Sequence, residues 1–282
     1  MNVDINSAIQ KIISFFTSIF SKHNHDNIEN DMSTNQTSTD DESTENAITE
    51  NENLTNTDMS YEKLMVHLDN GHGKATPGKR SPSATTGNGY GQYTAQQLTI
   101  YEYEYNRLIV KLVDEKLRQL RFKTFIVTPE VEGDIGLTTR AMRSNDMATK
   151  NPNLKHIFIS AHLNACGDGV TWYTGNNGSY WCAYTSKGQT QGDKLADCFY
   201  DAAEEILTPL KKRIKTDGTD GDRDVEENFT VIAKTNSPAV LVESLFMTNV
   251  DDVLFLKSDE GIKAIVDIYV KACMKYADKY AK

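Results

Sequence analysis

The sequence predicts an α/β fold: a single domain with a mostly parallel, twisted sheet flanked by helices on both faces, preceded by a disordered N-terminal tether. Short apolar runs at 65–68, 124–127, 157–160 and 239–242 are typical of strands buried on both faces of a parallel sheet. Segments with helical periodicity separate these runs, as in folds that cover a sheet with helices. Residues 24–60 are rich in Asn, Thr, Ser, Asp and Glu and cannot bury enough apolar surface to fold.

Residues 1–22 are predicted to form an amphipathic helical segment, which is too short and too polar to span a bilayer. It also lacks the basic start and the small-residue cleavage site of a clear signal peptide. A membrane-surface anchor, a self-association helix and a helix packed on the domain all stay open, with residues 5–20 as the contacting segment. Its apolar face consists of Ile5, Ile9, Ile12, Ile13, Phe16, Ile19 and Phe20.

Residues 23–62 are predicted to be an acidic, disordered linker. They contain eleven acidic residues and no lysine or arginine, and residues 1–22 carry a net charge of +1. The total charge of −10 therefore leaves residues 63–282 neutral. A neutral domain without a basic patch argues against a nucleic-acid partner. The four cysteines show no CxxC spacing, so we expect free thiols in a chain made in the cytoplasm.

Residues 63–282 are predicted to form one catalytic domain of alternating elements. Strands are expected at 64–69, 123–128, 155–161, 169–174, 179–185, 228–234 and 238–243. Helices are expected at 98–119, 189–214, 250–257 and 259–280, with a short one within 129–150. Long loops are expected at 70–97 and 215–227.

Metal-binding side chains follow two of these strands. His72 lies just after the first apolar run, and His162 ends the run at 157–160 in the same way. Function in open α/β sheets collects beyond the carboxyl ends of the strands, so we expect the two histidines to meet there. Catalytic zinc sites use three His or carboxylate ligands and keep a fourth position for water. Glu102, at the start of the next helix, is the predicted third ligand of Zn²⁺.

The helix face on which each residue lies distinguishes Glu102 from Glu104 as the candidate ligand. Glu102 shares a face with Asn106 and Ile109, four and seven residues further on. Glu104 aligns instead with Lys111, which marks a solvated face. The inward phase favours Glu102 as the ligand.

Glu243 ends the apolar run at 239–242, where a buried carboxylate is costly unless it has a partner or a catalytic task. A structural ion pair is one interpretation. The other is a general base beside a metal site, since burial raises a carboxyl pKa towards neutrality. We predict Glu243 as the catalytic base.

The loop from Gly73 to Lys79 nearly matches the phosphate-binding pattern GxxxxGK after a strand. Arg80 stands where that pattern needs Ser or Thr, and the residues that follow cannot open a helix. We therefore reject a nucleotide-binding loop.

These residues together resemble the zinc-dependent N-acetylmuramoyl-L-alanine amidases of bacterial cell-wall remodelling and of phage endolysins. The resemblance extends over residues 63–280, and its first and last segments are the most specific. The chain departs from the family's pattern in having Ser244 and Leu245 after the late glutamate, where a glycine is usual. The matching segments are 68–73 (LDNGHG), 102–107 (EYEYNR), 140–145 (RAMRSN), 158–165 (FISAHLNA) and 237–249 (SPAVLVESLFMTN).

The resemblance implies a function and a set of roles. The implied reaction is hydrolysis of the amide between N-acetylmuramic acid and L-alanine in peptidoglycan, in the cell wall or the periplasm. Zinc would be held by His72, Glu102 and His162, and Glu243 would be catalytic. A zinc peptidase acting on the stem peptide and a non-catalytic peptidoglycan-binding module stay open. The substrate contacts implied are Asn70, Arg80 and Asn164.

Overall fold

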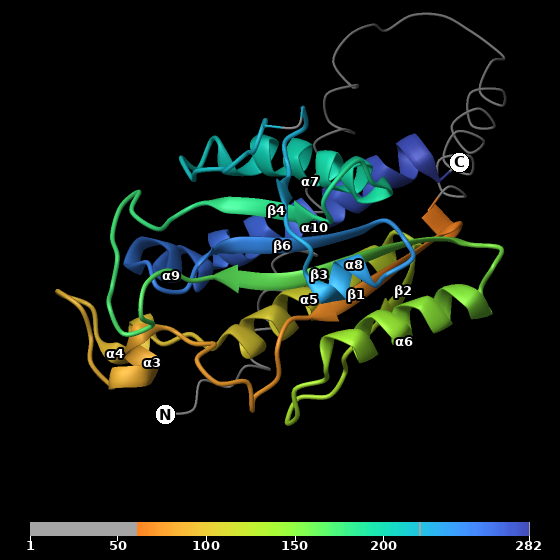
Figure 1. The fold of residues 1–282 in the computed structure, drawn as a ribbon. Coiled ribbons are helices and arrows are strands. Elements are labelled where there is room, and N and C mark those ends of the chain that lie inside the picture. Colours follow the sequence, from red (N-terminus) through yellow and green to blue (C-terminus); the bar gives the residue numbers. More distant parts are fainter. Residues whose placement is uncertain (1–60, 220, 282) are drawn as a thin grey trace, which may run out of the picture. The chain divides into compact units, whose positions relative to one another are not determined.

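The structure, a computed structural model, describes residues 61–219 and 221–281. These residues form a six-stranded sheet with helices on both faces (Figure 1), which confirms the predicted fold class. The strand order is β2-β1-β3-β6-β4-β5. The strands are β1 (Leu64–Asn70), β2 (Lys123–Ile126), β3 (Lys155–Asn164), β4 (Trp181–Thr185), β5 (Val225–Glu226) and β6 (Ala239–Phe246).

Four neighbouring strands of the sheet are parallel, and the last two, β4 and β5, run in the opposite direction. β1 pairs in parallel with β2 and β3, and β3 pairs in parallel with β6. β4 runs antiparallel to β6, while β5 is parallel to β4. The carboxyl ends of β1, β3 and β6 consequently lie side by side at one edge, where α/β folds place their sites.

Two groups of helices cover the sheet (Figure 1). The helices α5 (Glu102–Gln119), α7 (Gln191–Leu207) and α10 (Asp259–Tyr280) pack together on one face. The helices α6 (Leu137–Lys150) and α8 (Thr230–Ala233) lie on the other face and contact each other. The three remaining described helices are α3 (Pro82–Thr86), α4 (Ala95–Leu98) and α9 (Val250–Leu256). None of the helices in the described part of the chain is long and apolar enough to span a membrane.

Caps and burial explain why the long helices form where they do. Thr190 and Asp193 form a capping box at the start of α7, so the first backbone N–H groups have partners. The same helix ends at Leu207, and Pro209 two residues later has no backbone N–H with which to continue the helical hydrogen bonds. The predicted helix 189–214 was therefore too long.

Three other element predictions were wrong for local reasons. Residues 169–174 form a loop, with positive φ at Gly169 and a single bridge from Tyr173 to Asn249. Residues 228–234 contain the short helix α8 instead of a strand, and it buries Val231 and Ile232 together on the sheet. The helix predicted from 98 begins at Glu102, because α4 ends before it. The predicted segments 1–22 and 23–62 lie outside the described residues, apart from 61 and 62.

Candidate metal centre

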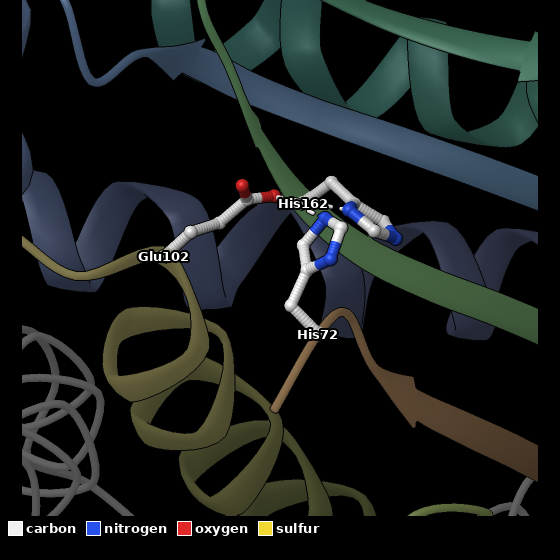
Figure 2. Close-up of side chains that lie close together, drawn as sticks. All are labelled: His72, Glu102 and His162. Carbon is white, nitrogen blue, oxygen red and sulfur yellow. Dashed lines mark hydrogen bonds and ion pairs between the residues drawn. The ribbon is translucent and has the colours of Figure 1, made fainter. Parts of the chain in front are cut away.

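His72, Glu102 and His162 meet at the carboxyl edge of the sheet (Figure 2). One potential ligand atom from each residue lies within 4.8 Å of the other two. Glu102 Oε1 is 3.4 Å from His72 Nε2 and 3.0 Å from His162 Nδ1. The two imidazole rings stand edge to face, with centroids 4.8 Å apart. The three side chains come from the loop after β1, the start of α5 and the end of β3.

The loop that carries His72 is held between β3 and α5. Gly71 N donates to Ala161 O at 3.0 Å, and Asn106 Nδ2 donates to Gly71 O at 3.2 Å. Any Cβ at Gly71 would lie 2.4 Å from the His162 ring, so only glycine allows this approach. His72 itself has φ 64, in the left-handed region that costs a non-glycine residue about 1–2 kcal/mol. The surrounding contacts therefore impose the conformation of His72.

Glu102 is fully buried at the first turn of α5, whereas Glu104 is exposed. Its backbone N donates to Lys79 O at 3.0 Å, which ties the helix start to the loop after His72. Its Oε1 accepts from Leu163 N at 3.1 Å. Its Oε2 is buried and has no hydrogen-bond partner among the described residues. A buried carboxylate oxygen without a partner is costly, and a metal ion would compensate it.

The pKa values of the three side chains depend on burial and on the contacts between them. Burial lowers the pKa of His72 to about 4, against the opposing effect of Glu102. Burial would also lower the pKa of His162 and raise that of Glu102. Their mutual hydrogen bond and the surrounding charges together outweigh burial, so the pKa of His162 is raised and that of Glu102 is lowered. Two imidazole nitrogens and one carboxylate form the donor set of a catalytic zinc site, and these residues fit that ion.

Glu243 lies on β6 directly opposite His162 on β3. Burial raises the pKa of Glu243 to about 8, and Glu102 adds to this, while His162 and Lys79 oppose it. The Oε2 atom of Glu243 is buried and has no hydrogen-bond partner in the described part of the chain. A carboxyl group with a pKa near neutrality can accept and return a proton.

The strand is irregular immediately after Glu243. The register between β3 and β6 shifts between His162 and Asn164, and Leu245 has φ 69. A glycine would adopt this φ without strain. The Leu245 side chain is completely buried, so burial offsets the backbone cost at this departure from the family's pattern.

The three predicted substrate contacts differ in their surroundings. Asn70 is buried and its Nδ2 donates to Thr128 O at 2.8 Å, which supports the loop before His72. Arg80 is exposed, and its Nε donates to Thr85 Oγ1 at 3.2 Å. Asn164 is half-buried at the end of β3, and its Oδ1 accepts from Ala165 N at 2.8 Å.

Sequence reasoning missed Lys79. This half-buried lysine is close enough to affect the charges of His72, Glu102 and Glu243, and it opposes the raised pKa of Glu243. Among the described residues, no carboxylate forms an ion pair with Lys79. The GxxxxGK pattern contains this lysine, so the signal was present in the segment rejected as a nucleotide-binding loop.

Comparison with known proteins decides the family. The family model described as N-acetylmuramoyl-L-alanine amidase matches residues 66–275. The chain belongs to the N-acetylmuramoyl-L-alanine amidase family. The match covers the three residues of the cluster and the neighbouring carboxylate of Glu243. The resemblance predicted from the sequence is thereby confirmed.

Individual relatives of this amidase-family chain are distant. It is 28% identical to the endolysin of Bacillus phage SPP1 over 206 residues, which are 72% of this chain and 62% of the endolysin. The match thus spans less than two thirds of that relative. It is 25% identical over 227 residues to the uncharacterized protein YqiI of Bacillus subtilis strain 168, covering 77% of this chain and 87% of YqiI.

Solved structures support the fold of this amidase-family chain. The N-acetylmuramoyl-L-alanine amidase from Clostridium difficile 630 superposes with a TM-score of 0.57 at 24% identity, covering 78% of this chain and 99% of that one. Ami1 from Mycobacterium smegmatis gives a TM-score of 0.56 at 18% identity, covering 77% and 97%. At these identities the likeness bears on the fold alone.

Proposed function

We propose that this chain is a zinc-dependent hydrolase that cleaves the amide between N-acetylmuramic acid and L-alanine in peptidoglycan, and so acts on the cell wall. Family membership supports the amidase activity. The observation that carries the zinc dependence is the convergence of His72, Glu102 and His162 beside Glu243. These residues supply ligands and a base at one point of the sheet edge.

The roles of the side chains follow from their surroundings. His72 Nε2, His162 Nδ1 and the carboxylate of Glu102 would hold the zinc ion. When bound, zinc lowers the pKa of water and polarises the carbonyl of the scissile amide. Glu243 takes a proton from the attacking water and returns it to the leaving nitrogen of L-alanine. The buried, unpartnered Oε2 of Glu243 is the atom available for this transfer.

The products identify the reaction. Purified peptidoglycan is incubated with the chain, and the released fragments are analysed by mass spectrometry. An amidase releases intact stem peptides that begin with a free L-alanine amine. A zinc peptidase would instead leave shortened stem peptides on the glycan, and a binding module would release nothing. Either of the last two outcomes contradicts the proposal.

The metal is tested separately. Elemental analysis should find one zinc ion per chain, and His72→Ala should lose both the zinc and the activity. His156→Ala is the matched control, because His156 lies outside the cluster and its Nε2 contacts Asn151 O at 2.9 Å. Stoichiometric zinc in a folded His72→Ala protein would rule out this ligand set.

A further inference from the structure

We propose that Asp69 and Ser160 are positioning residues that hold the hydrogen of His162 on Nε2 and so leave Nδ1 free to bind zinc. The inference rests on the proposed zinc site. Asp69 and Ser160 are register partners on β1 and β3, on the sheet face that carries α6. They form a buried chain of contacts that ends at the His162 ring.

The distances define this chain. Ser160 Oγ donates to Asp69 Oδ2 at 2.7 Å, and His162 Nε2 lies 3.1 Å from the same Ser160 Oγ. On the other side of the ring, His162 Nδ1 faces Glu102 Oε1 at 3.0 Å. Asp69 is 1% exposed and Ser160 is fully buried, so water does not compete for these bonds.

The number of available hydrogens fixes the direction of the bonds. A carboxylate accepts hydrogen bonds only, so the contact with Asp69 uses the single hydroxyl hydrogen of Ser160. The hydroxyl oxygen can then only accept from His162, and the hydrogen must come from Nε2. In the metal-free protein Nδ1 carries a second hydrogen, which bonds Glu102. Loss of that hydrogen leaves a neutral imidazole with its hydrogen on Nε2 and a lone pair on Nδ1, the atom that faces the cluster. Metal-bound histidines commonly donate their other ring N–H to a partner that fixes the ring, and here a serine connects the ring to the carboxylate.

Arg140 on α6 holds Asp69 in its acceptor role. Its Nη1 donates to Asp69 Oδ1 at 3.0 Å, and Thr128 Oγ1 donates to the same oxygen at 3.0 Å. Arg140 Nη1 also donates to Asn70 O at 2.7 Å, at the start of the loop that carries His72. One buried ion pair therefore supports both histidine ligands, His162 through Ser160 and His72 through the backbone of Asn70.

Asp69→Asn tests the direction of the bonds with little change in shape. The new amide can donate to Ser160 Oγ, which frees the serine hydroxyl to donate to His162 Nε2. The hydrogen of His162 then moves to Nδ1 and blocks zinc. Ser160→Ala removes the bridge but keeps the Asp69–Arg140 ion pair, and Ser160→Thr restores a hydroxyl. Asp134→Asn is the matched control, because Asp134 also pairs with Arg140, at 3.0 Å, yet is 42% exposed and outside the chain of contacts.

The zinc dissociation constant, measured by competition with a chelator, is the main readout. We expect it to rise about 10–100-fold in Asp69→Asn and Ser160→Ala, and to stay within about threefold of the original in Ser160→Thr and Asp134→Asn. In the zinc-loaded protein, the NMR signal of the His162 Nε2 hydrogen should exchange slowly with water and should be lost in Ser160→Ala. Thermal melts of the metal-free proteins verify folding, and Ser160→Ala decides alone if Asp69→Asn does not fold.

Unchanged zinc affinity in a folded Ser160→Ala protein would overturn the inference, as would an equal loss in Asp134→Asn. Failure of the parent chain to bind zinc would overturn the proposed metal site as well. The two failures are therefore distinguishable in one titration series.

Discussion

His162 and Glu243 are direct register partners on the two neighbouring parallel strands β3 and β6. The pairing places an imidazole of the candidate metal site and a carboxyl group side by side at the edge of the sheet. The charge of His162 opposes the raised pKa of Glu243 but does not cancel the effect of burial, which leaves that pKa at about 8. The backbone of the sheet thus sets the position of the proposed ligand relative to the proposed base.

Glu243→Gln should separate a catalytic base from a structural carboxylate. Glutamine keeps the size of the side chain but cannot accept the proton of the attacking water. We expect turnover to fall by about 10²–10⁴-fold with zinc content and melting temperature preserved. Glu104→Gln, an exposed change on α5, is the control and should be neutral. Near-normal release of stem peptides by a zinc-loaded Glu243→Gln protein would assign the base elsewhere.

Lys79→Met should impair catalysis where Arg80→Met does not. Lys79 influences the cluster electrostatically, whereas the Arg80 side chain bonds Thr85. We expect kcat/KM to fall about 10–100-fold in Lys79→Met. This is the loss expected when one hydrogen bond to a charged group, of about 1.5–3 kcal/mol, is removed. Arg80→Met should stay within about twofold, as surface changes usually do. Steady-state kinetics on a soluble muramyl peptide measure both, and the reverse order would favour the original prediction of Arg80.

Acid should destabilise the metal-free protein through His67. Burial lowers the pKa of His67 from 6.5 to about 3, and His156 adds to this. The folded state therefore holds His67 neutral. The contribution of this group to the free energy of unfolding is present above pH 6.5 and is lost as the pH falls towards 3. Between pH 6.5 and 4.5 one such group removes about 2 kcal/mol from the free energy of unfolding. Urea unfolding at a series of pH values should show that the free energy of unfolding falls less steeply with acid in His67→Gln than in the original protein. The same slope in both proteins would contradict this.

A chain starting at Ser60 should fold and hydrolyse peptidoglycan like the full chain. Tyr61 is buried and stacks on Phe122 with ring centroids 4.6 Å apart, so this residue is part of the packed domain and is kept. We propose that residues 1–22 contact a membrane surface and that residues 23–62 act as a linker. Removing residues 1–22 should then abolish binding to anionic lipid vesicles. Equal vesicle binding with and without these residues would dismiss the anchor.

The sequence was sufficient to predict these four strands, because β1, β3 and β6 each contain a short, mostly apolar run and β2 overlaps the one at 124–127. It was not sufficient for α8, where two adjacent apolar residues suit a buried strand as well as one helical turn. The two-residue strand β5 carries no periodic signal at all. Short elements depend on what they pack against, which the local sequence does not contain.

The candidate site likewise has a part that the sequence predicts and a part that only the assembled structure reveals. His72, His162 and Glu243 were predictable from position, since each comes directly or shortly after an apolar run of the sequence, and helical phase added Glu102. The support of His162 by Asp69 depends on the register of β1 against β3 and on a contact from α6. Register is a property of the assembled sheet, so no inspection of these segments alone could have revealed it.

The place of β6 in the sheet has a consequence for synthesis. This strand is among the last elements of the chain, yet it lies between β3 and β4 and separates them. A nascent chain that has left the ribosome only as far as β4 lacks the strand that joins the two parts of the sheet, and it also lacks Glu243. Contacts between such distant segments form late in folding. The growing polypeptide therefore cannot complete the candidate site before β6 has left the ribosome, which separates the synthesis of His72, Glu102 and His162 from the assembly of the site.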